Sequence, residues 1–165
     1  KNNDKFNITI LTTDIHDPGF VDNRCDIKMD TNVSKLTKAM ICTSDALYKF
    51  IKYIQDNYSD NTTIVIIGDH IYPGKLNVNN LNNTAERTLY NRIISKDFSI
   101  NRDLINHYDL FPTILNLLNF SFKNNRLGLG YSAIKNADIA NYNSYFKNLE
   151  ENIENKSDRY VEFWK

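Results

Sequence analysis

Apolar residues along the chain fall into patterns that predict two β-strands separated by a helix. In residues 6–12, apolar and polar side chains alternate, which is typical of a strand with one buried face. Apolar residues then recur every three or four positions over residues 36–54, which predicts a helix that ends before Ser59. A break or fresh start is expected near residues 43–45, where Thr, Ser and Asp are good N-cap residues. The continuous β-branched run 62–67 predicts a central strand buried on both faces.

The order strand, helix, buried strand predicts a βαβ unit with parallel strands, and hence an α/β fold. Residues 71–86 are rich in Asn and contain Pro and Gly, so we expect a surface loop there, followed by a strand at 88–94. A helix is predicted at 108–118, with Pro112 in its first turn. The remaining predicted elements are a glycine-bearing turn at 126–131 and a polar amphipathic helix at 139–153.

Length, charge and composition narrow the classes of function. The chain has 165 residues, 41% of them apolar, which suits one folded domain or a large piece of one. Twenty basic and 20 acidic residues give a formal net charge of zero, whereas nucleic-acid binders usually carry a basic excess. We therefore expect no nucleic-acid partner. No run of about 18 apolar residues is present to span a membrane. Residues 1–5 are polar and lead directly into the first predicted strand, so we expect the chain to begin inside a domain.

The two cysteines, Cys25 and Cys42, are too few for a zinc knuckle and do not form a C-x-x-C pair. They are either two separate buried thiols or one disulfide, which needs an oxidising compartment. Residues 26–38 between them are polar and without a clear pattern. Cross-linking a loop of this length contributes about 3 kcal/mol in the chain-entropy account. The disulfide is therefore the favoured interpretation.

The sharpest chemical signal is Gly68-Asp69-His70, which directly follows the predicted buried strand. Open α/β sheets bind ligands at the carboxyl ends of their strands, and a carboxylate beside an imidazole suits Mn²⁺ or Zn²⁺ better than Ca²⁺. The alternative is an Asp that caps a turn beside a His that only packs. The first predicted strand ends in a similar set, Asp14, His16 and Asp17, so neighbouring strands would bring His16 to this triplet. Two protein ligands alone make a poor metal site, and the substrate, another chain or another segment has to complete it.

The third histidine, His107, stands at the start of a predicted helix beside Asp109. A histidine in that position is more simply explained by a local hydrogen bond than by a catalytic role. The sequence contains no G-x-S-x-G elbow, P-loop or G-x-G-x-x-G fingerprint. The hypothesis of a catalytic site therefore depends on Asp69, His70 and His16.

These residues lie in segments that resemble the alkaline phosphatase/sulfatase superfamily. Gly68-Asp69-His70 after an Ile/Val strand resembles the metal-binding triplet of sulfatases and lipoteichoic acid synthases. Residues 109–115, Asp-Leu-Phe-Pro-Thr-Ile-Leu, resemble a helix start common in the superfamily. Residues 13–20, Thr-Asp-Ile-His-Asp-Pro-Gly-Phe, resemble a segment of bacterial phosphoglycerol transferase I, which decorates osmoregulated periplasmic glucans. The two cysteines, the 127–130 turn and the terminal Trp-Lys pair follow in the order of the same enzyme family.

The resemblance implies the C-terminal half of an alkaline-phosphatase-like α/β/α sandwich with a mainly parallel sheet, formed by residues 1–165. Asp69 and His70 would be two ligands of a divalent metal, expected to be Mn²⁺, with Zn²⁺ or Mg²⁺ as alternatives. His16 would be the catalytic residue that binds the phosphate or glycerol of the substrate, with Asp14 beside it. The two cysteines would form a disulfide. The N-terminal half of the domain, with a Thr nucleophile and an acidic metal ligand, would be absent from this sequence.

The activity implied is transfer of phosphoglycerol from phosphatidylglycerol to a periplasmic glucan or similar glycan through a phospho-threonine intermediate. The partners would be a phospholipid head group, a glycan acceptor and the missing half of the domain, on the periplasmic side of a bacterial inner-membrane protein. Residues 71–75, Ile-Tyr-Pro-Gly-Lys, depart from the glucan enzyme. The alternatives are a phosphoethanolamine transferase, a lipoteichoic acid synthase-like enzyme, a sulfatase or a non-catalytic fragment, and the isolated chain is expected to be inactive.

Overall fold

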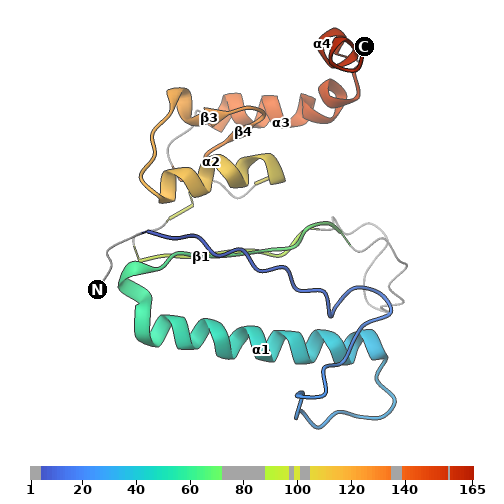
Figure 1. Ribbon diagram of the computed structural model, residues 1–165. Helices are drawn as coiled ribbons and strands as arrows, with labels where there is room; N and C mark the ends of the chain where they lie inside the picture. Colours follow the sequence, from blue (N-terminus) through green and yellow to red (C-terminus); the bar gives the residue numbers. More distant parts are fainter. Residues whose placement is uncertain (1–4, 72–87, 97–98, 101–104, 135–138, 156) are drawn as a thin grey trace. The chain divides into compact units, whose positions relative to one another are not determined.

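Figure 1 shows the computed structural model, which describes residues 5–71, 88–96, 99–100, 105–134, 139–155 and 157–165. The chain divides into two units, Lys1–Ile64 and Val65–Lys165. The described residues combine helices with two small two-stranded sheets, which is consistent with an α/β fold. None of the helices formed by these residues is long and apolar enough to cross a membrane.

Helix α1 (Lys35–Tyr58) is the main element of the first unit and runs without a break (Figure 1). The hydroxyl of Ser34 caps it by accepting a hydrogen bond from the N–H of Thr37 at 3.1 Å. The break expected near residues 43–45 is wrong, because this stretch lies inside the helix. Asp45 there pairs with Lys49 one turn later, with 2.7 Å between the nitrogen and the oxygen, and so supports the helix from within. A single 3₁₀ turn, η1 (Ser59–Asn61), follows the helix.

The strand predicted at residues 6–12 is wrong, because these residues have no regular secondary structure. Their apolar side chains are exposed rather than half-buried, with exposed fractions of 84% for Phe6, 69% for Ile8 and 64% for Ile10. Alternation identifies a face that can be buried, but a strand also needs a neighbour whose backbone pairs with it. The structure assigns no such pairing to these residues, so the expected βαβ unit is not formed by the described part of the chain.

Strands β1 (Ile64–Ile67) and β2 (Asn91–Ile94) form one two-stranded sheet. Each lies within the range predicted for it, so both strands are confirmed. Burial of β1 on both faces is wrong, since Ile67 is 47% exposed and the other three residues of the strand are only half-buried. From residue 72 onward, the loop predicted at 71–86 lies outside the described residues.

The second unit also contains helix α2 (His107–Leu117), which begins with a capping box. The side chain of Asn106 accepts the N–H of Asp109 at 3.1 Å, and the Asp109 carboxyl accepts the N–H of Asn106 at 3.0 Å. The sequence predicted Pro112 in the first turn of the helix, but it lies in the second turn. Proline cannot supply the N–H that would bond to the carbonyl of Tyr108 four residues earlier. That carbonyl therefore lacks its usual partner in the helix.

A short hairpin packs against helix α2 at this carbonyl. Strands β3 (Arg126–Leu127) and β4 (Gly130–Tyr131) pair antiparallel, with Leu127 opposite Gly130. Gly128 has a φ of +60° at the first position of the two-residue turn, a conformation that favours glycine. A Cβ atom at Gly130 would overlap the carbonyl of Tyr108, so only glycine fits where the hairpin meets the helix. The predicted glycine-bearing turn is confirmed.

Asp109 is fully buried and connects three elements of the second unit. Its Oδ1 accepts the N–H of Tyr131 in β4 at 2.8 Å, and its Oδ2 accepts the hydroxyl of Tyr142 in α3 (Ile139–Glu154) at 2.5 Å. One turn later, the hydroxyl of Thr113 accepts the N–H of Ala133 at 2.9 Å. The Asp-x-x-Pro-Thr segment of α2 therefore holds the helix, the hairpin and α3 together. A short helix, α4 (Asp158–Phe163), follows with the aromatic residues that end the chain.

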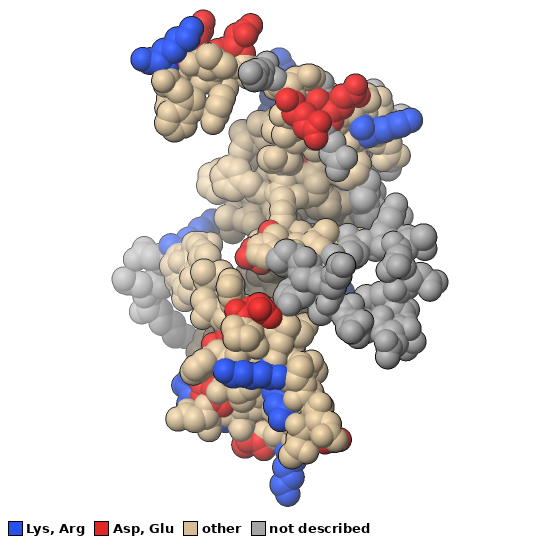
Figure 2. All heavy atoms as spheres, turned by 90° about the vertical axis from the view of Figure 1, so that its right-hand side faces the viewer, with Lys and Arg blue, Asp and Glu red and all other residues tan. Residues whose placement is uncertain are grey.

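Acidic and basic side chains are interspersed on the face of the protein in Figure 2. Some of them form exposed ion pairs, such as Lys52 with Asp56 one turn later on α1, at 2.9 Å. Exposed pairs of this kind are screened by water and contribute little to stability. They therefore add little to the stability of α1 compared with its packing and its cap.

Candidate functional site

Asp69 and His70 follow strand β1 after a single glycine, so the structure places them at the carboxyl end of a strand. Both side chains are open to solvent, 77% exposed for Asp69 and 64% exposed for His70. Asp69 Oδ2 and His70 Nε2 lie 3.5 Å apart. Two ligands bound tetrahedrally to one ion at distances of about 2.0–2.2 Å lie about 3.4 Å from each other. These two atoms are therefore spaced as ligands of one metal ion.

Hydrogen bonds orient both members of this pair. Asp69 Oδ1 accepts the backbone N–H of His70 at 3.0 Å, which leaves Oδ2 on the side of the imidazole. His70 Nδ1 lies 2.9 Å from the carbonyl oxygen of Ile71. Because a carbonyl only accepts, Nδ1 carries a proton, and in the neutral imidazole the lone pair is then at Nε2, on the side of Asp69. Metal-binding histidines typically donate their other N–H to a carboxylate, a backbone carbonyl or water, so the orientation of His70 fits a ligand.

The donor set at Asp69 and His70 is incomplete. The described part of the chain contains no group of three or more His, Cys, Asp or Glu residues that could hold a metal ion. One carboxylate oxygen and one imidazole nitrogen suit Mn²⁺ or Zn²⁺ in their chemistry, but zinc sites use three or four ligands. The two residues therefore fit part of a metal site.

His16 lies in a tightly turned loop of the first unit. Its N–H bonds to the carbonyl of Thr13 at 3.0 Å, and its own carbonyl accepts the N–H of Gly19 at 2.7 Å. His16 Nδ1 lies 3.0 Å from the carbonyl oxygen of Asp17, so Nδ1 donates and Nε2 remains available to a ligand. The side chain of His16 is exposed, and Asp14 beside it is half-buried.

Gly19 packs the His16 loop onto the start of α1. It is buried, has a φ of +89°, and a Cβ atom there would lie 2.6 Å from the Cα of Leu36. The loop is therefore supported by a helix and not only by its own turns. His16 belongs to the first unit, whereas Asp69 and His70 belong to the second. Their convergence at one site stays a prediction.

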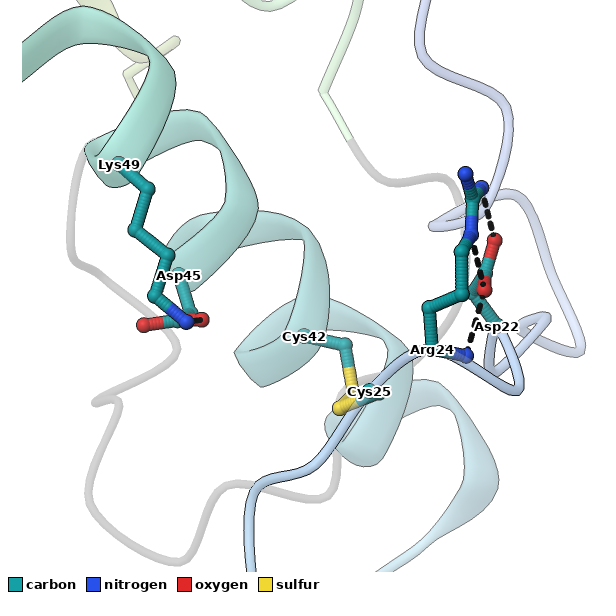
Figure 3. The surroundings of a disulfide bond; sticks show 6 residues. All are labelled: Asp22, Arg24, Cys25, Cys42, Asp45 and Lys49. Carbon is teal, nitrogen blue, oxygen red and sulfur yellow. Dashed lines mark hydrogen bonds and ion pairs between the residues drawn. A yellow bond between two sulfur atoms is a disulfide. The ribbon is translucent and has the colours of Figure 1, made fainter. Parts of the chain in front are cut away.

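The disulfide favoured by the sequence is present and joins Cys25 to Cys42, with 5.7 Å between the Cα atoms (Figure 3). It links the loop after the His16 segment to α1. Near it, the guanidinium of Arg24 hydrogen-bonds both oxygens of Asp22, at 2.9 and 2.6 Å (Figure 3). These hydrogen bonds hold the pKa of the Asp22 carboxyl below its usual value.

His107 makes a contact that the sequence interpretation missed. Its Nε2 lies 3.0 Å from the carbonyl oxygen of Gly68, which is 39 positions away in the sequence. The sequence predicted a local hydrogen bond at the helix start, and this prediction is wrong. The bond instead connects the first residue of α2 to the residue before Asp69. The only signal in the sequence was that His107 stands next to a segment that resembles the superfamily.

Comparison with protein families matches residues 1–120 to the family described as Sulfatase. The matched range includes the loop of His16, the Asp69–His70 pair and all of α2. The chain belongs to the sulfatase family. Members of the sulfatase superfamily are typically hydrolases or transferases. No curated protein and no solved structure matches this sulfatase-family chain.

Proposed function

We propose that this sulfatase-family chain contributes two metal ligands to a phosphoglycerol transferase. The observation that carries the proposal is the pairing of Asp69 Oδ2 with His70 Nε2 at 3.5 Å, with the other nitrogen of His70 bound to a backbone carbonyl. The spacing, the donor types and the hydrogen bond at Nδ1 match two ligands of one divalent ion. The family match supports an enzyme that cleaves or transfers a charged ester.

In this proposal the metal site is completed from outside residues 1–165. Asp69 and His70 provide two ligands, and an acidic residue and a Thr nucleophile come from the preceding half of the same domain. The intact domain is then an α/β/α sandwich with a mainly parallel sheet, of which this chain is the C-terminal part. The metal is Mn²⁺, with Zn²⁺ or Mg²⁺ as alternatives, and when bound it would stabilise negative charge on the phosphate.

The chemistry transfers a phosphoglycerol group in two displacements. The Thr oxygen attacks the phosphorus of phosphatidylglycerol, and the bond to diacylglycerol breaks, with a proton passing to the leaving oxygen. A glycan hydroxyl then attacks the same phosphorus and releases the Thr. His16 acts in its doubly protonated form: Nδ1–H stays on the Asp17 carbonyl, while Nε2–H binds the phosphate or the glycerol and passes its proton to the leaving diacylglycerol oxygen. Nε2 then takes the proton of the glycan hydroxyl in the second displacement, as the Thr leaves as the alkoxide that attacked. Asp14 lies beside it and contacts the substrate.

Phosphatidylglycerol and a periplasmic glucan are the proposed substrates, and the periplasmic side of a bacterial inner membrane is the proposed location. A direct test uses the intact protein with Mn²⁺, vesicles of phosphatidylglycerol labelled in the head-group glycerol, and a glucan acceptor. Replacing Asp69 by Asn removes a charged ligand, so label transfer should fall by at least about 10²-fold. Asp26→Asn, a change at another exposed carboxyl, is the matched control and should retain transfer. Transfer at the normal rate by the Asp69→Asn variant would refute the ligand assignment.

Hydrolysis of a sulfate ester is the second candidate, because the family match is to the family described as Sulfatase. A sulfatase would use the same Asp69–His70 pair and pass the group to water instead of a sugar hydroxyl. The intact protein should then release the fluorophore from 4-methylumbelliferyl sulfate and leave labelled phosphatidylglycerol unchanged. The disulfide and the 127–130 turn, which resemble the transferase, favour the first candidate.

A further inference from the structure

We propose that His107 is a positioning residue for the Asp69–His70 pair, an inference that rests on the function proposed above. His107 Nε2 lies 3.0 Å from the carbonyl oxygen of Gly68. The carbonyl can only accept, so Nε2 carries the proton and donates. The oxygen that it holds belongs to the peptide group between Gly68 and Asp69. His107 therefore acts on the peptide plane that sets the direction in which Asp69 leaves the strand.

Both backbone polar groups of Gly68 are held in place. Its N–H donates to the carbonyl of Tyr90 at 2.9 Å, just before β2, and its carbonyl accepts from His107 in α2. Two different elements therefore fix this residue from opposite ends of its backbone. Glycine has no side chain to restrict its own φ and ψ, so these two hydrogen bonds help to limit its conformations. The backbone that leads into Asp69 and His70 is therefore held in position.

The hydrogen bonds continue from Gly68 to the two ligand atoms. The peptide after Gly68 leads to Asp69, whose Oδ1 accepts the N–H of His70. His70 in turn donates from Nδ1 to Ile71. The 3.5 Å separation of the two ligand atoms is set by these local bonds and by the backbone from which they start. Binding of an ion depends on ligand positions held to about 0.5 Å, so loosening Gly68 should weaken it.

Helix α2 is a firm base for this contact. The capping box of Asn106 and Asp109 closes the first turn, where His107 lies. Asp109 is fully buried and bonds to the hairpin and to α3. His107 hydrogen-bonds Gly68 from this first turn. It connects the buried polar centre of the second unit to the exposed ligand pair.

The test compares two amide side chains of different length. His107→Gln keeps an N–H donor that can reach the position of Nε2, whereas His107→Asn places the same group near Nδ1, short of Gly68. Both substitutions are polar at an exposed position, so both variants should fold. Mn²⁺ binding to the intact protein is measured by calorimetry, and the electron paramagnetic resonance spectrum of bound Mn²⁺ reports the symmetry of the site.

We expect His107→Asn to weaken Mn²⁺ binding by about 10–100-fold and to change the Mn²⁺ spectrum, as loss of an outer-shell partner does. His107→Gln should restore most of the affinity and the normal spectrum. Tyr108→Phe, the neighbouring position on α2, is the matched control and should bind as the wild type does. Equal affinities and spectra for the Asn and Gln variants would overturn the positioning role.

Asp69→Ala separates this inference from the proposed function. If Asp69→Ala loses Mn²⁺ and His107→Asn binds it normally, the ligand assignment stands and only the positioning role is wrong. If the wild type binds no Mn²⁺, or if Asp69→Ala binds it as tightly as the wild type does, the proposed metal site is wrong and the inference falls with it. If His107→Asn loses Mn²⁺ affinity and His107→Gln recovers it, the result supports both the metal site and the positioning role of His107.

Discussion

Asp109→Asn should destabilise the second unit strongly although it changes a single atom. The carboxyl of Asp109 is fully buried and accepts hydrogen bonds from the N–H of Tyr131, the N–H of Asn106 and the hydroxyl of Tyr142. An amide has one oxygen and one NH₂ group, so it can accept only at one of the two positions. In its better orientation it keeps the two bonds at Oδ2 and turns its NH₂ group toward the N–H of Tyr131.

The magnitude follows from the groups left without partners. In that orientation the N–H of Tyr131 and one N–H of the new amide face each other in a buried site. Each buried donor without a partner costs roughly 1–3 kcal/mol, so we expect a loss of about 3 kcal/mol. For a chain of this size, each kcal/mol corresponds to about 2–4 °C, so the melting temperature should fall by about 6–12 °C.

Urea denaturation followed by circular dichroism measures the change in the free energy of unfolding. Tyr142→Phe is the matched variant, because it removes one hydrogen-bond donor to the Asp109 carboxyl and leaves two others. It should lower the free energy of unfolding by about 1–2 kcal/mol. The loss of unfolding free energy in the double variant should be smaller than the sum of the two single losses, since both changes remove part of one hydrogen-bond network. A midpoint for Asp109→Asn within error of the wild type would refute the view that this carboxyl holds the unit together.

Three further outcomes test other parts of the fold. Gly130→Ala should lower the melting temperature, because the added methyl group overlaps the backbone of α2 and overpacking costs about 1–3 kcal/mol; an unchanged melting curve would contradict the close approach. Replacing Cys25 and Cys42 together by Ser should lower the free energy of unfolding by about 3 kcal/mol, and a reductant should have the same effect on the wild type but none on the variant. The folded pKa of Asp22 is depressed by Arg24, so its contribution is present above the unfolded value of about 3.9 and is lost as the pH falls through the folded pKa. Asp22→Asn should therefore weaken the loss of stability in acid, and an NMR titration that finds an ordinary pKa would contradict the ion pair.

The sequence predicted elements well where the pattern within one segment decides the structure. The long helix, strand β1 and the 126–131 turn follow from apolar spacing, β-branching and glycine, which act over a few residues. Asp69 and His70 were proposed as a site in the same way, because a polar pair at the end of an apolar run is a local signal, and their role stays a prediction. Their mutual orientation also depends on neighbours in sequence, since the bonds that fix it join adjacent residues.

Features that depend on distant segments were not predictable from the sequence. Residues 6–12 have the alternation of a strand, but alternation does not say whether a pairing neighbour is present. Pro112 was assigned to the first turn of a helix because proline is common there, whereas it lies in the second turn, where the distant hairpin at Gly130 approaches the carbonyl of Tyr108. The bond from His107 to Gly68 spans 39 positions and has no counterpart in any local spacing.

The meeting of Pro112 with Gly130 has a consequence for how this segment can evolve. A residue without an N–H leaves a carbonyl free, and a residue without a side chain lets a second backbone approach it. Both residues act at the same carbonyl, that of Tyr108. Related sequences that keep the short hairpin against α2 should therefore keep glycine at the position of Gly130, whereas sequences without the hairpin should accept a side chain there.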